Sequence, residues 1–171
     1  FKGSTSLKSV DFKAQEIEYN AFSNCSALEN VKLETVKIIS NNAFNNCCDL
    51  ESIVIPNSVT SIGNNAFSCC YALESIVIPN GVTTINNGAF SECSSLSSIK
   101  LPESLTNLSQ QWIFSECTSL KEVFFFAKTP PYIAYGMFRG LTPTIYVPKE
   151  SLDVYKKALY WQDFDIQAIP Y

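Results

Sequence analysis

Histidine is absent from this sequence of 171 residues. Its absence excludes Ser-His-Asp and Cys-His nucleophile pairs, histidine metal ligands and the usual proton shuttle near neutral pH. The sequence also lacks any run of 18 apolar residues that could span a membrane. Its 12 basic residues are scattered, so there is no Lys/Arg stripe that could neutralise the phosphates of a nucleic acid. A net charge of −4 and a hydrophobic content of 46% are ordinary for one soluble domain with a core.

The start of the chain shows no secretory signal peptide. Its first seven residues, FKGSTSL, look like the end of an earlier copy of the repeat described below. We therefore expect the chain to begin inside a longer protein, in which case the missing signal carries no information about the compartment.

A repeat of about 23 residues runs through nearly the whole chain. Residues 53–75 and 76–98 are consecutive blocks of 23 residues that are identical at 15 positions. The same register recurs around six phenylalanines spaced 22 to 24 residues apart: Phe22, Phe44, Phe67, Phe90, Phe114 and Phe138. A period of 20–29 residues with a conserved spacing of Leu and alternating apolar residues is typical of leucine-rich-repeat solenoids.

Each copy also contains an apolar-x-apolar triplet, whose period of two predicts a short β-strand. The seven triplets are Val10/Phe12, Val31/Leu33, Ile53/Ile55, Ile76/Ile78, Ile99/Leu101, Val123/Phe125 and Ile145/Val147. Because one copy is too small to bury a core alone, stacked copies must share ladders of Ile, Leu, Phe and Cys. The sequence predicts a repeat solenoid: a right-handed coil with a parallel β-sheet of about seven short strands, and short helical or 3₁₀ turns on the other side.

The two central copies carry a specific motif. The pattern L-x-x-I-x-I-P-x-x-V-T-x-I-x-x-x-A-F-x-x-C in residues 53–98 resembles the BspA-like leucine-rich repeat, and the resemblance covers nearly all of the chain. The first copy departs from it because no Pro follows the triplet. The fifth departs because Trp112-Ile113-Phe114 replaces x-Ala-Phe. Atypical terminal copies are expected where a solenoid closes its ends.

We interpret residues 149–171 as a C-terminal cap of the same domain as the repeats in residues 1–148. The spacing i, i+3 and i+7 of three apolar residues predicts an amphipathic helix from residue 149 to about 160. These residues are Leu152, Tyr155 and Leu159, and the residues expected to complete a hydrophobic lid over the last coil are Trp161, Phe164 and Ile166. This ending also resembles the C-terminal segment of bacterial members of the family.

The seven cysteines admit metal, disulfide and nucleophile interpretations. Five occupy one column, three residues after the Phe of each copy: Cys25, Cys47, Cys70, Cys93 and Cys117. With no His and no Cys-x-x-Cys, zinc and a Cys nucleophile lack their usual partners. Adjacent coils could bring column thiols within disulfide reach, but a packed ladder disfavours the required torsion. We therefore interpret the column as core filler, expect free thiols, and expect Cys48 and Cys69 to be the more exposed pair. No catalytic residue, metal site or cofactor is predicted.

The middle residue of each triplet should point outward from the sheet. The candidate partner-binding residues are the middle positions of the last six triplets together with Phe126: Lys32, Val54, Val77, Lys100, Phe124, Phe126 and Tyr146. A row of exposed apolar residues marks interaction surfaces, and aromatic residues are frequent anchors of a partner. Two alternatives remain open. The valines can reflect strand propensity, and the three aromatic residues can pack beneath the cap instead.

A regular outward face predicts a non-catalytic interaction module rather than an enzyme. The resemblance implies a secreted or cell-surface protein that adheres to an extracellular protein of a host or of a neighbouring cell, frequently in anaerobic bacteria. A glycan is another possible partner, because Trp112, Trp161, Phe124 and Tyr146 could stack on sugars. The second hypothesis is an intracellular or periplasmic scaffold that uses the same face. Free thiols fit an oxidising exterior poorly, unless the setting is anaerobic.

Overall fold

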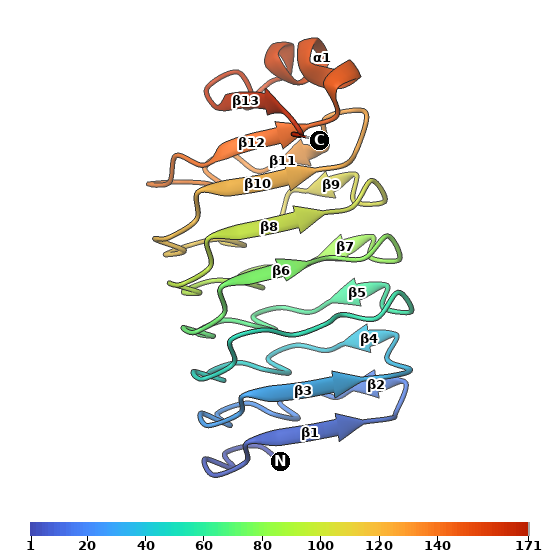
Figure 1. The fold of residues 1–171 in the computed structure, drawn as a ribbon, viewed down its shortest axis with the longest axis vertical. Coiled ribbons are helices and arrows are strands. Elements are labelled where there is room, and N and C mark those ends of the chain that lie inside the picture. Colours follow the sequence, from blue (N-terminus) through green and yellow to red (C-terminus); the bar gives the residue numbers. More distant parts are fainter. Residues whose placement is uncertain (171) are drawn as a thin grey trace.

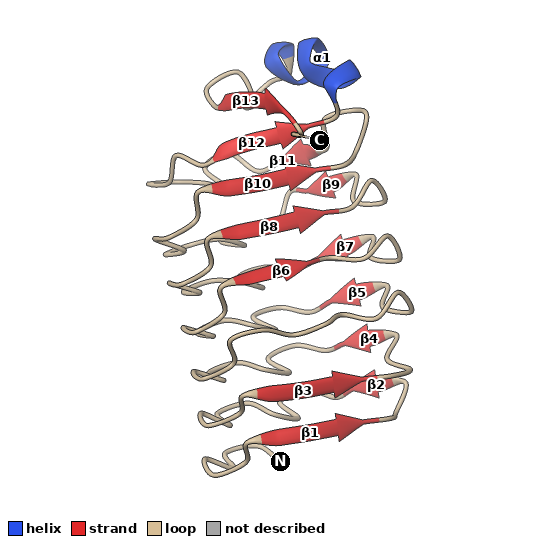
Figure 2. Cartoon of the chain, viewed as in Figure 1, coloured by secondary structure: helices blue, strands red, loops and turns tan. Residues whose placement is uncertain are grey.

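The chain winds into a right-handed stack of parallel coils, as Figure 1 shows for the computed structural model, which describes residues 1–170. We number the coils 1 to 6 by the phenylalanines Phe22, Phe44, Phe67, Phe90, Phe114 and Phe138. The triplets form the side of the stack that faces the viewer in Figure 2, here called the main side. The second side lies behind it and is built from the Ile or Leu that precedes each Phe by five or six residues.

The strands of the main side are all parallel, as expected when each coil repeats the path of the one before. They are β1 (Ser9–Phe12), β3 (Asn30–Leu33), β6 (Ser75–Val77), β8 (Ser98–Leu101), β10 (Glu122–Phe125), β12 (Thr144–Val147) and β13 (Asp165–Ala168). They pair as two sheets: β1 with β3, and β6-β8-β10-β12-β13 as a five-stranded sheet. The predicted parallel sheet is confirmed.

The sheet of the main side is interrupted at coil 3. Residues Ser52–Ile55 run along this side, but they form no strand, and within residues 1–170 no backbone hydrogen bond links them to either neighbouring coil. Ile53 and Ile55 nevertheless point inward and are buried. Six of the seven triplets therefore form strands, and β13, which the sequence analysis did not predict, supplies the seventh strand of this side.

The second side consists of two-residue strands that the sequence analysis did not predict. They are β2 (Glu16–Ile17), β4 (Ile38–Ile39), β5 (Ser61–Ile62), β7 (Thr84–Ile85), β9 (Asn107–Leu108) and β11 (Tyr132–Ile133). They pair as β2-β4-β5-β7 and, separately, as β9-β11. Where helical or 3₁₀ turns were predicted, the Ala-Phe segments make single i→i+3 turns, such as the bond from Cys25 N–H to the Phe22 carbonyl (3.1 Å). Within residues 1–148 these turns do not extend into a helix.

The core is a set of columns that run the length of the stack. The rings of Phe1, Phe22, Phe44, Phe67, Phe90, Phe114 and Phe138 stack face to face, with consecutive centroids 5.3 to 6.0 Å apart. Beside them, each column cysteine donates its thiol to the carbonyl oxygen of the Phe one coil earlier, at 2.9 to 3.2 Å. Cysteine is suited to this column because it is apolar enough for the core and still satisfies that carbonyl.

The C-terminal segment closes the end of the stack. It contains the 3₁₀ helix η1 (Lys149–Ser151), the helix α1 (Leu152–Lys157) and β13, which extends the five-stranded sheet by pairing with β12. Tyr155 and Trp161 are buried, and they donate to the carbonyl oxygens of Ala127 (2.9 Å) and Pro131 (3.1 Å). Both rings contact Phe125, one of the two inward residues of β10.

One residue of the predicted cap helix is placed wrongly by the sequence analysis. Leu159 is 68% exposed, because α1 ends at Lys157 and the backbone is extended at Ala158. The position i+7 therefore no longer lies on the helix. Tyr171, the last residue of the predicted cap, lies outside the described residues.

Candidate partner-binding site

Strand alternation builds a row of outward side chains across the main side. The strand registers pair Asp11 with Lys32 at one end, and they align five residues in neighbouring strands at the other: Val77, Lys100, Phe124, Tyr146 and Gln167. Val54 belongs to the same row by its place in the repeat. We call these residues, Asp11 to Gln167, the outward row. Residues on either side of each row member along its strand are inward, as in Ile99–Lys100–Leu101, where only the lysine is exposed.

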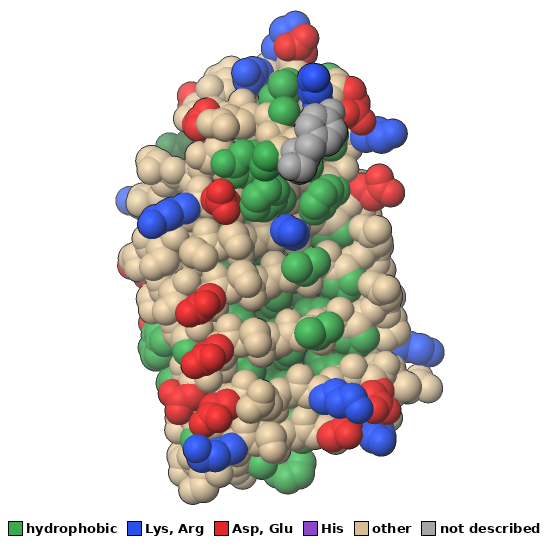
Figure 3. Space-filling model, viewed as in Figure 1, with side chains coloured by type: hydrophobic (Ala, Val, Ile, Leu, Met, Phe, Trp, Pro, Cys, Tyr) green, Lys and Arg blue, Asp and Glu red, His purple; other side chains and the backbone are tan. Residues whose placement is uncertain are grey.

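The part of the outward row on the five-stranded sheet is aromatic. The rings of Phe124 and Tyr146 stack with centroids 4.7 Å apart and planes within 14° of parallel. From the opposite neighbour, β8, Lys100 places its Nζ 5.7 Å from the centroid of Phe124, within cation–π distance. Both faces of Phe124 are thus occupied within the row. Figure 3 shows hydrophobic side chains gathered near the C-terminal end of this face.

The outward direction of these aromatic residues separates them from the cap. The cap packs on Phe125, which points inward from the same strand, whereas Phe124 and Tyr146 stay partly exposed and lie outside the buried core cluster. Phe126, one residue beyond β10, is 40% exposed, and its N–H donates to the carbonyl of Leu101 at 3.1 Å. Within residues 1–170, therefore, the cap packs on the inward face of β10 and these side chains do not lie beneath it.

The part of the outward row on β1 and β3 is charged. Lys32 contacts Glu34 at 2.8 Å and Asp11 at 3.8 Å, and Lys13 lies 3.8 Å from Glu34. The hydrogen bond to Glu34 and the charge of Asp11 raise the pKa of Lys32, and the same hydrogen bond together with the charge of Lys13 lowers the pKa of Glu34. Lys32 is thus already paired with two carboxylates. We expect it to contribute less to a partner than an unpaired lysine would.

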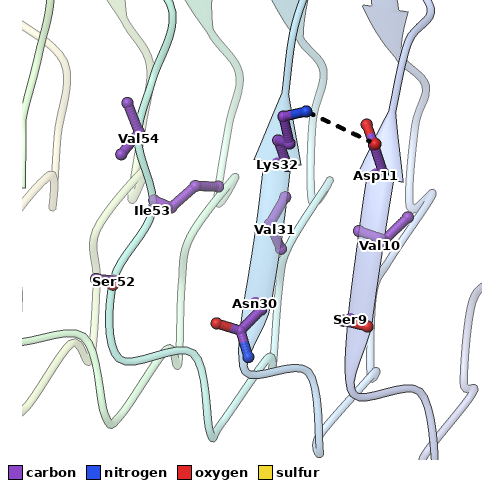
Figure 4. Close-up of a pocket in the computed structure, with 9 residues that line it drawn as sticks. All are labelled: Ser9, Val10, Asp11, Asn30, Val31, Lys32, Ser52, Ile53 and Val54. Carbon is purple, nitrogen blue, oxygen red and sulfur yellow. Dashed lines mark ion pairs between the residues drawn. The ribbon is translucent and has the colours of Figure 1, made fainter.

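A shallow hollow of about 360 Å³ lies beside these charges, where the sheet is interrupted. Figure 4 shows Ser52, Ile53 and Val54 of coil 3 alongside β3 and β1, with Lys32 directed toward Asp11. Val54 is 80% exposed. The candidate residues therefore fall into two environments. A charged and hollowed part lies over coils 1 to 3, an aromatic part lies over coils 5 and 6 and β12, and Val77 lies between them.

The thiols are free, and five of them are inaccessible. The column cysteines are buried, while Cys48 and Cys69 are partly exposed, which confirms both expectations. Burial raises the pKa of Cys47 and of Cys117 to about 12, and it raises the pKa values of Cys70 and Cys93 well above the ordinary value. These four thiols stay protonated at neutral pH, so they are poor nucleophiles and poor metal ligands. Among the described residues, no cluster of three or more Cys, Asp or Glu could hold a metal ion.

Three exposed aromatic residues of coils 5 and 6 lie off the main side and outside the predicted partner-binding set. Trp112, Tyr132 and Tyr135 are 66%, 60% and 88% exposed. The available signal was the departure of Trp112 from the repeat consensus at a position where other copies have Asn or Gly.

The fold and its repeating columns define a leucine-rich-repeat solenoid. A family model described as a BspA type leucine rich repeat region matches six copies, over residues 1–75 and 37–162. The chain therefore belongs to the BspA-type leucine-rich-repeat family. Repeat folds of this kind are typically non-enzymatic and are consistent with protein interaction.

Solved structures of bacterial leucine-rich-repeat proteins are similar to this chain. A leucine-rich-repeat protein from T. pallidum is 35% identical, with a TM-score of 0.69 over 72% of this chain and 58% of that one. One from Bacteroides ovatus is 30% identical, with a TM-score of 0.69 over 88% and 45%. A leucine-rich cell surface protein from Faecalibacterium prausnitzii is 34% identical, with a TM-score of 0.64 over 69% and 32%.

This chain corresponds to only part of these relatives, since the matches span between about one third and three fifths of their lengths. No curated protein matches the chain. In the part of the chain that the structure describes, helices long and apolar enough to cross a membrane are not found.

Proposed function

We propose that this chain is a non-catalytic adhesion module of a secreted or cell-surface protein, and that it binds an extracellular protein of a host or neighbouring cell through the outward row. Membership of the BspA-type family supports an interaction role. The surface location is supported by one relative, 34% identical, that is itself described as a cell surface protein. The observation that carries the proposal is the Lys100–Phe124–Tyr146 stack, which stands on an unbroken five-stranded sheet.

This stack has the properties of an interface anchor. Phe124 and Tyr146 are held in place by each other and by Lys100, so little side-chain entropy is lost when a partner covers them. Aromatic residues at the centre of a patch carry most of the energy of many interfaces. Val77 and Phe126 extend the apolar area beside the stack, while the charged residues around Lys32 would affect the association rate and the orientation of the partner.

The test uses the double variant Phe124→Ser/Tyr146→Ser. Its matched control is Tyr19→Ser/Tyr71→Ser, which also removes two exposed aromatic rings but from positions off the main side. Binding to purified extracellular-matrix proteins is measured by biolayer interferometry, and folding by thermal unfolding. We expect a loss of affinity of about tenfold or more for the first variant and little change for the control. Equal loss in both variants, or loss of folding in the first alone, would contradict the proposed anchor.

A scaffold inside the cell or in the periplasm is the second candidate function. The observation that favours it is the presence of seven free thiols, which are uncommon in proteins exposed to an oxidising exterior. The two candidates use the same face and differ in location. Two observations would distinguish them: whether the full-length gene encodes an N-terminal secretory leader, and whether the protein is labelled on the surface of intact cells.

A further inference from the structure

Trp112 is held in a backbone conformation that is unfavourable for a bulky residue. Its φ is 57°, in the left-handed region, where a Cβ meets the following carbonyl oxygen. The equivalent position in the other coils has a positive φ as well, but it is occupied by residues that tolerate this conformation: Asn20, Asn42, Asn65, Gly88 and Gly136. Local backbone stability therefore does not explain the tryptophan, and such strain is commonly retained where the side chain has a function.

The positions equivalent to Trp112 in the two adjacent coils carry no side chain. Gly88 occupies this position in the coil before, and Gly136 occupies it in the coil after. Among residues 1–170, Trp112 takes part in no aromatic pair and no cation–π contact, although 13 aromatic pairs are present in the structure. The indole is 66% exposed.

The backbone beside Trp112 is open as well. In coils 1 to 4 three N–H groups around each Phe donate to the next coil; in coil 4 these bonds are Gly88 to Gln111, Phe90 to Ile113 and Glu92 to Ser115. We call these bonds the corner ladder. In coil 5 the equivalent donors are Trp112, Phe114 and Glu116, and within the described chain none of them makes a backbone bond to coil 6. The corner ladder thus stops at the coil that carries the exposed tryptophan.

The two segments around Trp112 in coils 5 and 6 are rich in aromatic and amide side chains. Residues 104–115 and 129–138 contain no charged residue; Glu103 and Glu116 flank the first segment, and Lys128 and Arg139 flank the second. Tyr135 occupies the position in coil 6 equivalent to Gln111, and it contacts Tyr160 of the cap edge to face, with centroids 6.0 Å apart. The polar side chains contributed by coil 5 are Asn107, Ser109, Gln110 and Gln111.

We propose that Trp112, Tyr135 and Gln111 form a binding site for a neutral oligosaccharide, separate from the outward row. The flat apolar C–H face of a pyranose ring packs on an indole or phenol ring, and sugar hydroxyls exchange hydrogen bonds with amide side chains. Neutral sugars need no charged partner, which matches the uncharged segments. A protein or an acidic glycan would be expected to meet charged side chains as well. Tyr132, on β11, extends the aromatic surface along the same two coils.

The experiment uses the intrinsic fluorescence of the protein, because the chain has only two tryptophans and Trp161 is buried. Iodide quenching is measured with and without millimolar cellohexaose, mannohexaose or xylohexaose, and with heparin and hyaluronan hexasaccharides as the charged arm. Calorimetry gives affinities for Trp112→Asn and for the matched control Tyr19→Ser/Tyr71→Ser, which removes exposed aromatic rings from positions that belong to neither proposed site. Trp112→Asn should fold, since Asn occupies this position in coils 1 to 3.

We expect at least one neutral hexasaccharide to reduce iodide quenching of Trp112. We also expect Trp112→Asn to weaken its binding by about tenfold or more, while the control binds as the parent does and the thermal midpoint of Trp112→Asn is unchanged or higher. The proposal is overturned if none of the neutral sugars protects Trp112, if only the charged sugars do, or if Trp112→Asn binds equally well. Protection of Trp112 by a matrix protein alone would overturn it too, and would leave the proposed role of the outward row intact.

Discussion

Coils 3 and 4 have nearly the same sequence, yet the structure joins them to their neighbours differently. Both contain the segment IVIP, at residues 53–56 and 76–79. In coil 4 this segment forms β6 and pairs with β8, while in coil 3 it makes no ladder on the main side. On the second side the situation is reversed, because β5 of coil 3 pairs with both of its neighbours, whereas β7 of coil 4 pairs with β5 only.

This difference shows that three ladders hold the solenoid together and that none of them is continuous. The junctions of coil 3 with coils 2 and 4 lack the ladder of the main side, the junction of coils 4 and 5 lacks the ladder of the second side, and the junction of coils 5 and 6 lacks the corner ladder. Each of these four junctions therefore keeps two of the three ladders, and the junction of coils 1 and 2 keeps all three. Because stability in a solenoid is approximately a sum over neighbouring coils, interruptions at different junctions avoid a single weak plane.

The Phe column is expected to support both kinds of coil equally. Phe67 in coil 3 and Phe90 in coil 4 are both fully buried and stack on a ring in each neighbouring coil, at 5.3 to 6.0 Å. We expect Phe67→Ala and Phe90→Ala each to lower the free energy of unfolding by about 3–5 kcal/mol, the usual cost of a cavity left by a core aromatic residue.

Chemical denaturation of the two variants measures this cost, and Phe1→Ala is the control, because Phe1 stacks on one ring only and is largely exposed. A much smaller loss for Phe67 than for Phe90 would mean that coil 3 relaxes around the cavity because the main side is open there. In that case the column would not compensate for the missing ladder.

Hydrogen exchange compares the two IVIP segments directly. The Ile78 N–H donates to the Lys100 carbonyl at 2.9 Å, while the equivalent N–H of Ile55 has no backbone partner within residues 1–170. We expect the Ile55 amide to exchange about 100-fold faster than that of Ile78, a difference of about 2.8 kcal/mol in the free energy of opening. The measurement is amide exchange followed by NMR. The Gly63 amide, which donates to Ile39 on the second side of coil 3, should stay protected. Similar protection of Ile55 and Ile78 would show that the ladder forms in solution.

The repeat period was sufficient to predict the parallel coils, the inward Phe and Cys columns and the outward direction of Lys100, Phe124 and Tyr146. These features follow from spacing alone, because like residues in successive coils must lie above one another. The interruption at coil 3 could not be predicted, since the letters IVIP are the same where the strand forms and where it does not. Pairing depends on the neighbouring coils, which a local pattern does not describe.

The sequence could define the outward row and the C-terminal segment only in part. The row position of Phe124 and Tyr146 was predictable, but their mutual stacking and the placement of Lys100 depend on side-chain packing. At the C-terminus, the helix was predicted from three apolar residues, and its early end removed Leu159 from the stripe. The residues of β13, Asp165 to Ala168, alternate between polar and apolar, but four residues outside the repeat register do not identify a partner strand, and the pairing is set by β12 at the end of the preceding sheet.

The thiol column passes through both parts of the molecule, and alkaline pH tests whether it is equally buried in each. Cys47 lies in coil 2 and Cys117 in coil 5, and burial raises the pKa of each thiol from 9.0 to about 12. Between these two pH values the unfolded chain has lost the proton and the folded chain retains it. Each thiol thus contributes stability that is fully present below pH 9 and is lost as the pH rises toward 12, at about 1.4 kcal/mol per pH unit.

We expect Cys47→Ala and Cys117→Ala to reduce the alkaline slope of the free energy of unfolding by about this amount each, and by the same amount as one another. Urea denaturation at several pH values between 8 and 11, under reducing conditions, measures the slope, and Cys48→Ala serves as a control because Cys48 lies off the column and is partly exposed. A slope that changes only for Cys117→Ala would show that the interruption of the main side at coil 3 admits water to the core beside Cys47. The core beneath the charged part of the outward row would then be less tightly packed than the core beneath the aromatic part.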